Sequence, residues 1–298
     1  MNKNQMVGRA IALGAAIFYG FNTTLSRLAY DTGTTPVSLT LYRFLMSAVI
    51  MMLLLLILRK SWKFEVAPGL FAICAIGMFV TSIGHLGAVN YIPVSLAAII
   101  FYSFPLMVVA YKRIAHRQAV TRNELLAFVL AFIGIGIALG PDFHEFDPIG
   151  IALAFSGAIG ATVFILSYER FPPQTDSYVG ATWIMITALV FALLLLQLGF
   201  DLEPPRESIG WVYLALITAA SITSFVLSLQ AINRIGGAIF ALLLNFEPVV
   251  ILLLAWIVIG EQLSPERISG IALIVFALFL SHWKVRRIDS KTEEAPSD

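Results

Sequence analysis

Long apolar stretches alternate with short polar segments along the whole chain. Each stretch is 17 to 24 residues long, close to the roughly 20 residues that a helix needs to cross a hydrocarbon core about 30 Å thick. The run from Val66 to Tyr111 contains no Asp, Glu, Lys or Arg, which leaves room for two crossings and a turn. We therefore predict an all-α integral membrane protein with ten transmembrane helices, at residues 8–29, 36–58, 66–89, 93–111, 124–140, 148–168, 178–199, 209–232, 237–259 and 266–284.

The second half of the chain repeats the pattern of the first at a distance of 143 positions. One copy runs from Ala88 to Leu125 and the other from Ala231 to Ile268. Each copy contains a polar joint, an apolar helix with a proline near its middle, a polar loop and a last apolar helix. We interpret this as a duplication. It predicts two five-helix repeats, at residues 1–143 and 144–288, followed by a disordered cytoplasmic tail at residues 289–298.

Composition supports a membrane protein and excludes most soluble classes. Hydrophobic residues make up 59% of the chain and charged residues 12%, against about 45–50% and about 25% in soluble domains. The single Cys74 cannot form an internal disulfide, and no Cys/His cluster suggests a metal site. No catalytic constellation is evident, so we expect no enzyme activity, no cofactor, no metal and no nucleic-acid partner. The glycine pairs Gly84/Gly87 and Gly157/Gly160 predict close helix packing instead.

The distribution of Lys and Arg predicts how the chain is oriented in the membrane. With the N-terminus placed in the cytoplasm, fifteen of the 19 Lys and Arg residues fall on the cytoplasmic side. Only Arg206 and Arg267 fall outside, while Arg27 and Arg43 lie within predicted helices. Because positive residues concentrate in cytoplasmic segments, both termini should be cytoplasmic. Five helices per repeat then give the two repeats opposite orientations.

Polar side chains within the predicted helices form stripes on single helical faces. In the first helix, Tyr19, Asn22, Thr23 and Ser26 share one face with Arg27. Polar groups are costly in lipid unless they face protein or water, so this stripe favours a water-filled cavity. Individual hydroxyls have an alternative, which is to bond neighbouring helices or carbonyls four residues back. The candidate cavity residues are Tyr19, Asn22, Thr23, Ser26, Arg43, Met78, Ser82, His85, Tyr102, Ser221, Ser224 and Asn245.

Glu247 lies near the centre of the ninth predicted helix, directly before Pro248. A charged residue at that depth costs roughly 2.5–3.5 kcal/mol on insertion scales, so the carboxylate should be protonated, paired or hydrated. Two interpretations remain open: a contact with a substrate or coupling proton, or an internal ion pair with Arg43 or Arg27. Pro105 and Pro248 interrupt the hydrogen bonding of their helices and are candidate hinges.

A Pro-Val pair, a Gly-Glu pair and a later Gly270 follow one another near the end of the chain. They stand in Asn245-Phe246-Glu247-Pro248-Val249-Val250 and in Gly260-Glu261-Gln262-Leu263-Ser264-Pro265. Together with Tyr42-Arg43-Phe44 at the start of the second helix, this pattern resembles the drug/metabolite transporter superfamily of EamA type. The resemblance covers nearly the whole chain. The first repeat departs from it, because Phe104 stands in place of Glu247 and Gln118 in place of Glu261.

The resemblance implies a secondary transporter of the cytoplasmic (inner) membrane that works by alternating access. Similar proteins commonly export amino acids and related metabolites, whereas others import vitamins or carry nucleotide-linked compounds. Facilitative carriage or import of such a metabolite is therefore the alternative function, and a pore or an intramembrane enzyme is a remote one. The implied partners are a small-molecule substrate and the lipid bilayer, the coupling ion stays open with protons as a candidate, and we expect a monomer.

Overall fold

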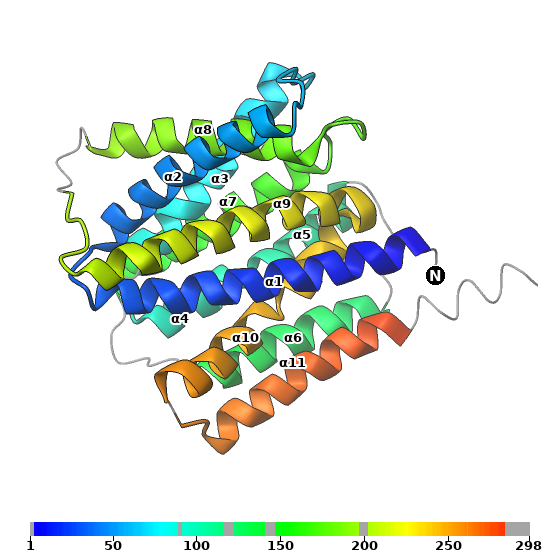
Figure 1. Ribbon diagram of the computed structural model, residues 1–298. Coiled ribbons are helices and arrows are strands. Elements are labelled where there is room, and N and C mark those ends of the chain that lie inside the picture. The colour runs from blue at the N-terminus through cyan, green and yellow to red at the C-terminus, as the bar shows by residue number, and fades with distance from the viewer. Residues whose placement is uncertain are drawn as a thin grey trace, which may run out of the picture.

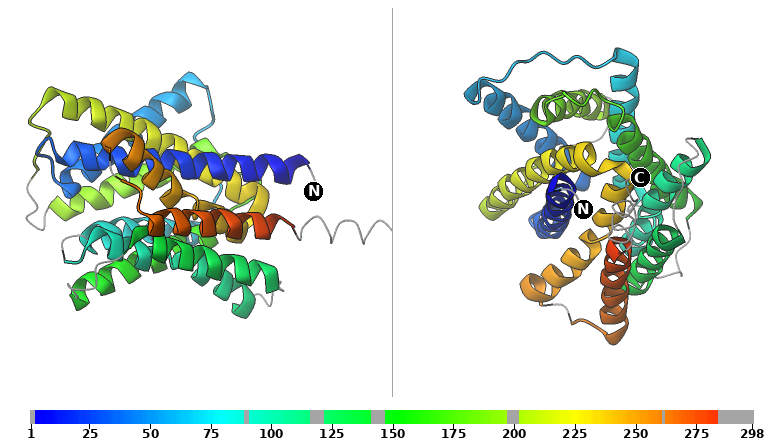
Figure 2. Two further views of the ribbon diagram at one scale, coloured as in Figure 1. Left: turned by 90° about the horizontal axis from the view of Figure 1, so that it is seen from below. Right: turned by 90° about the vertical axis from the view of Figure 1, so that its right-hand side faces the viewer.

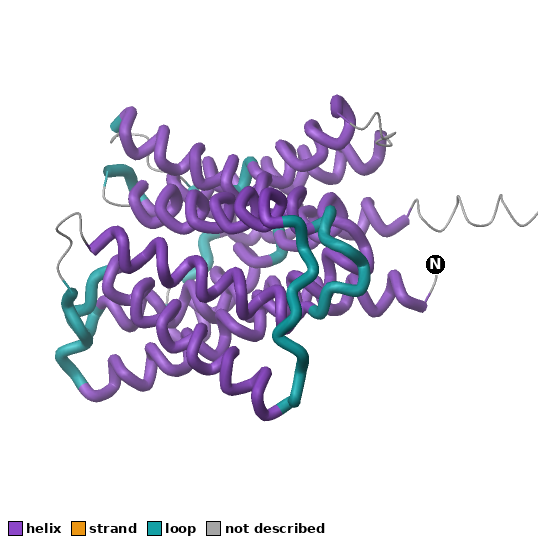
Figure 3. The backbone as a smooth tube through the Cα atoms, turned by 90° about the horizontal axis from the view of Figure 1, so that it is seen from above, coloured by secondary structure: helices purple, strands orange, loops and turns teal. Residues whose placement is uncertain are grey.

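A computed structural model describes residues 3–88, 91–115, 122–140, 147–196, 202–260 and 262–283. Gln118, Glu261 and the predicted tail at 289–298 lie outside the described residues. Within them every regular element is a helix, and no strand occurs (Figures 1 and 3). The elements are α1 (Lys3–Tyr30), α2 (Pro36–Ile57), α3 (Pro68–Ala88), α4 (Val94–Phe101), α5 (Phe104–Ala115), α6 (Arg122–Leu139), α7 (Pro148–Tyr168), α8 (Ser177–Leu196), α9 (Ser208–Leu244), α10 (Glu247–Leu254), the π-helix η1 (Ala255–Ile259) and α11 (Pro265–Trp283).

The helices have the length and apolar character of membrane spans. Seven described segments are long and apolar enough to cross a membrane, and one of these, Ser95–Ala115, joins α4 and α5. An all-helical chain with many membrane-capable helices is therefore confirmed, whereas the number of ten crossings stays a prediction. Figure 1 shows the N-terminus and the end of α11 at the same end of the bundle.

Helices far apart in the sequence pack as pairs. The most extensive contacts join α1 with α9, α3 with α7, α6 with α11 and α2 with α8. The end-on view in Figure 2 separates α6 and α11 on one side of the bundle from α2 and α8 on another, with α1 and α9 between them. Every one of these pairs joins a helix of the first half to a helix of the second.

Small residues allow α3 and α7 to approach closely. A Cβ built on Gly84 would lie 2.4 Å from the amide nitrogen of Gly157, and one built on Gly160 would lie 2.5 Å from that of Thr81. The helix backbones therefore touch without intervening side chains, as small residues permit in membrane proteins. This is the close packing that the glycine pairs predicted.

Two helix breaks occur at corresponding places in the two halves. α4 ends at Phe101 and α5 begins at Phe104, before Pro105; α9 ends at Leu244 and α10 begins at Glu247, before Pro248. A proline has no N–H to donate and its ring clashes with the carbonyl four residues earlier, so each break falls just ahead of a proline. Both candidate hinges thus lie at real interruptions, and their role as hinges stays a prediction.

The polar joint of the second repeat contains a kink, between the segments where we expected separate helices at 209–232 and 237–259. α9 includes both sides of the joint, but Gly236 has non-helical dihedral angles (φ 75°, ψ 160°), so two helices meet there. The second of these helices is shorter than expected, because it ends at Leu244, before the break ahead of Pro248. Glycine adopts a positive φ without the steric penalty of a Cβ. The chain therefore kinks at one residue and resumes the helix at once.

Candidate functional site

The Glu247 carboxylate lies at the second helix break, in the first turn of α10. The Thr23 hydroxyl of α1 donates to its Oε1 at 3.4 Å, and the buried Tyr102 hydroxyl, at the first break, is a second hydrogen-bond partner. α1 reaches α10 closely because Gly20 has no side chain: a Cβ there would lie 2.6 Å from Val250. The two breaks and α1 thus meet at one carboxylate.

Tyr19 extends this polar group toward α9. Its hydroxyl accepts a hydrogen bond from Ser228 at 3.4 Å, and Ser224 is a further partner one turn away. The same tyrosine lies within electrostatic range of both Glu247 and Arg43. Tyr19 therefore interacts with a carboxylate and a guanidinium that come from different helices.

Arg43, on α2, supplies the positive charge of the site. Its guanidinium carbon lies 5.2 Å from the centroid of the Phe44 ring, and Tyr30 and His85 are among its polar neighbours. Within the part of the chain that the structure describes, no Lys or Arg nitrogen lies within 4.0 Å of the Glu247 carboxylate. Glu247 and Arg43 therefore do not form the direct ion pair that the sequence left open, and Tyr19 is the side chain within electrostatic range of both.

Several hydroxyls of the predicted stripes bond carbonyls of their own helices. Ser26 donates to Asn22 O at 2.8 Å, Ser82 to Met78 O at 3.1 Å and Ser224 to Ser221 O at 3.0 Å. In this structure these serines therefore follow the structural alternative, since their donors are satisfied locally. Met78 also packs against the apolar cluster that includes Phe44.

Three predicted residues instead carry buried polar atoms without a hydrogen-bond partner in the structure. These atoms are Asn245 Oδ1, Ser221 Oγ and His85 Nδ1, and Asn245 is only 2% exposed. Buried polar groups are nearly always hydrogen-bonded to protein or ordered water. Such atoms are therefore available to a bound molecule or to water, and Asn245 adjoins the break that positions Glu247.

The site has residues that the candidate set missed. Ser228 is one of them, although its four-residue spacing from the candidate Ser224 was a usable signal. Tyr30, beside Arg43, gave no such signal because it stands at the end of α1. No group of three His, Cys, Asp or Glu side chains that would hold a metal occurs among the described residues.

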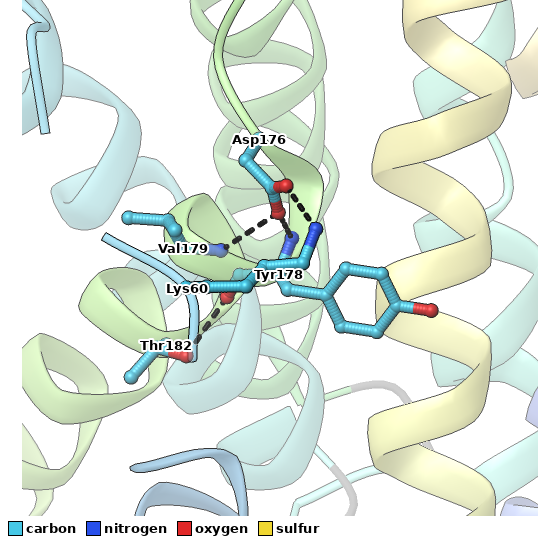
Figure 4. Close-up of polar contacts among 5 residues, drawn as sticks. All are labelled: Lys60, Asp176, Tyr178, Val179 and Thr182. Atoms are coloured by element: carbon cyan, nitrogen blue, oxygen red, sulfur yellow. Dashed lines mark hydrogen bonds and ion pairs between the residues drawn. The ribbon is translucent and has the colours of Figure 1, made fainter. Parts of the chain in front are cut away.

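A separate polar contact joins the loop after α2 to the start of α8 (Figure 4). Lys60 pairs with Asp176, whose carboxylate also accepts from the backbone N–H groups of Tyr178 and Val179. Partial burial raises the pKa of Asp176, but the hydrogen bonds from Lys60 and the two N–H groups outweigh this and hold it below its ordinary value. This contact ties the start of α8 to the preceding half of the chain.

A cavity of about 470 Å³ opens beside this contact, and no candidate site residue lines it. Its wall carries two lysines and two carboxylates, so it presents no net charge to a ligand. The lining residues are Lys60, Ser61, Lys63, Phe64, Glu65, Pro172, Gln174, Thr175, Asp176 and Val179.

Comparison with known proteins identifies relatives along the full length of the chain. The EamA-like transporter family matches residues 6–140 and, separately, residues 148–283. The uncharacterized transporter YwfM of Bacillus subtilis is 25% identical over 291 residues, which cover 94% of this chain and 95% of the relative. The chloramphenicol-sensitive protein RarD of Pseudomonas aeruginosa is 25% identical over 195 residues, covering 63% of this chain and 61% of that protein.

The fold is also similar to that of a protein chain of known crystal structure. The two superpose with a TM-score of 0.81 at 17% sequence identity, over 95% of this chain and 99% of the other. At that identity the likeness shows a shared fold alone. Since the family match extends over both halves and includes the segment around Glu247, this protein is a membrane protein that belongs to the EamA-like transporter family.

Proposed function

We propose that this protein is a gradient-driven secondary transporter that exports amino acids or related metabolites across the cytoplasmic (inner) membrane by alternating access. In this proposal ten helices cross the membrane, in two inverted five-helix repeats at 1–143 and 144–288, and both termini are cytoplasmic. The protein acts as a monomer. The observation that carries the proposal is the meeting of both helix breaks at one carboxylate.

The register of the helices supports the inverted repeat. Val94 at the start of α4 corresponds to Gly237, which directly follows the kink in α9, and Phe104 at the start of α5 corresponds to Glu247. Both pairs are 143 positions apart. The helix pairing agrees: exchanging the halves turns the α1–α9 pair into the α3–α7 pair, whereas α2–α8 and α6–α11 map onto themselves. This is the pairing expected of a twofold relation between two repeats.

The charges of the site support a substrate with two charged ends. An ammonium group can contact Glu247 and the Thr23 hydroxyl, while a carboxylate can form a charge-assisted hydrogen bond with the Arg43 guanidinium. Tyr19 lies within electrostatic range of both charges. A free α-amino acid carries both groups and is neutral overall, which limits the cost of bringing it into a site surrounded by lipid.

The experiment uses purified protein in liposomes and compares each amino acid with its amide and with the amine that lacks the carboxylate. We expect saturable counterflow of at least one amino acid and little flux of either analogue. Both analogues lack the carboxylate, so each of them leaves the Arg43 guanidinium without a partner. No counterflow of any amino acid would refute the substrate class. Flux without saturation would indicate a pore, and equilibration without gradient-driven accumulation would favour a facilitative carrier.

Glu247→Gln tests proton coupling in the same liposomes. The substitution keeps the shape and can keep the hydrogen bond from Thr23, but it removes the titratable group. We expect substrate exchange to continue while the response to a proton gradient is lost. Glu266→Gln, at an exposed carboxylate in the first turn of α11, is the matched control and should behave as the parent. A normal gradient response of Glu247→Gln would exclude coupling through this carboxylate.

A further inference from the structure

The last turn of α5 is joined to the end of α7 by two adjacent polar contacts. Lys112 Nζ lies 2.5 Å from Glu169 Oε1, and Arg170 donates to the Tyr111 hydroxyl at 2.9 Å. The Lys112 side chain is 11% exposed and that of Glu169 is 28% exposed, so solvent and salt screen this pair less than a surface pair. Consecutive residues of one helix end thus contact consecutive residues of another.

The same end of α7 also contacts the kink of α9. Asn233 donates to the Tyr168 hydroxyl at 3.4 Å. A Cβ built on Gly236 would lie 2.9 Å from Glu169 Oε1, and one built on Gly237 would lie 2.6 Å from Ile165. The Glu169 carboxylate therefore sits directly on the kink, and residues 168–170 join α5, α7 and α9 at one point.

These contacts close one end of the bundle over an apolar layer. Val108 lies one turn before Lys112 and is 0% exposed, and Ile165 lies one turn before Glu169 and is 3% exposed. Both side chains belong to the same buried apolar cluster. The polar contacts lie on the outer side of that layer.

The other end of the bundle has no counterpart to the ion pair. In the 143-residue register Lys112 corresponds to Ala255, and Glu169 corresponds to Ser26. Ser26 donates to its own helix, at the Asn22 carbonyl. At these equivalent positions the charge pair therefore has no counterpart, although the helices that carry it have equivalents in both halves.

We propose that the Lys112–Glu169 pair, supported by Tyr111–Arg170, is a latch that holds this end of the bundle closed and must break before the central site opens to it. The inference rests on the alternating access proposed above, in which this end is cytoplasmic. When the pair breaks, Lys112 and Glu169 each lose their partner at a partly buried place. The free-energy cost is larger than that of separating an ion pair on the surface, where water already solvates both groups. The latch therefore favours the state in which the site faces away from the cytoplasm.

The test measures opening directly, without a substrate. A cysteine introduced by Val108→Cys is labelled from the cytoplasmic side of oriented vesicles with a membrane-impermeant maleimide. The parent with Val108 intact measures any labelling of the native Cys74, which is fully buried. Glu169→Gln and Lys112→Met should each speed labelling about tenfold, which corresponds to about 1.4 kcal/mol lost from the closed state. The reversed pair, Lys112→Glu with Glu169→Lys, should return the rate toward that of the parent.

Lys60→Met is the matched control. It removes the Lys60–Asp176 pair, which joins the loop after α2 to α8 and involves none of α5, α7 and α9, so the labelling rate should not change. If the latch variants do not insert into the membrane, Tyr111→Phe tests the latch instead. It removes only the hydrogen bond from Arg170, at a more exposed residue, and should still speed labelling about threefold.

Unchanged labelling in the latch variants, or equal acceleration in Lys60→Met, would overturn the proposal. The two proposals fail separately. Faster labelling in a protein that transports nothing would leave the latch standing and refute the transport function, whereas transport with unchanged labelling would refute only the latch.

Discussion

Gly84→Ala tests the contact between α3 and α7 on which the joining of the two halves depends. The added Cβ would lie 2.4 Å from Gly157 N, 2.6 Å from Leu153 O and 2.7 Å from Gly157 Cα, all of them backbone atoms. Ordinary contacts begin at 3.4 Å, so the helices have to separate by about 1 Å, since no side chain can rotate away. Overpacking of this kind typically lowers stability by about 1–3 kcal/mol. We expect Gly84→Ala to lie at the upper end of this range, because the clash is between two backbones.

Thermal unfolding in detergent, followed by the loss of monodisperse protein on heating, measures the effect. Gly136→Ala is the matched control, because it lies in the last turn of α6 and a Cβ there meets nothing within 4 Å. Alanine favours a helix over glycine by about 1 kcal/mol, so Gly136→Ala should be neutral or stabilising while Gly84→Ala is destabilising. Equal stability of the two variants would show that α3 and α7 are not in backbone contact at this point.

Two further predictions concern the loops and the orientation of the chain. Asp176→Asn should lower stability at neutral pH by less than about 1 kcal/mol, because Lys60 loses its partner at a partly exposed site. Folding lowers the pKa of Asp176, so this carboxylate contributes to stability above its unfolded pKa of about 3.9, and the contribution is lost as pH falls through the lower folded pKa. A stability difference between parent and Asp176→Asn that persists in acid would contradict this. Reporter fusions after Arg122 should be cytoplasmic and those after Glu145 or Glu203 external, and a cytoplasmic signal at Glu145 would contradict five crossings in the first half.

The helices could be predicted from the sequence because each one is a local property. A backbone in lipid has to satisfy its own hydrogen bonds, so an apolar stretch of sufficient length forms a helix whatever its neighbours are. The breaks before Pro105 and Pro248 follow equally from the missing N–H of proline. The joint at the kink of α9 was predicted as four polar residues, whereas in the structure a single non-helical residue, Gly236, produces the change of direction.

The candidate site was predicted less completely, because the partner of a polar group is seldom local. Glu247 was recognised from its depth in an apolar helix, yet its bond from Thr23 joins residues 224 positions apart. The hydroxyls of Ser82 and Ser224 donate to carbonyls of their own helices in the structure, and their place in the cavity stays a prediction. Neither Lys112 nor Glu169 was selected, since each stands near the end of a helix, where a charged residue is ordinary.

The sequence by itself determined the class of this protein, the positions of its helices and the 143-residue correspondence between its halves. All three depend only on the order of apolar residues and prolines along the chain. Only the tertiary structure decided which helices pair and which polar faces meet. Lipid is as apolar as a protein interior, so hydrophobicity does not determine how a membrane helix is rotated about its axis. That rotation is set by close contacts such as Gly84 with Gly157 and Gly20 with Val250, and it brings Glu247 to Thr23.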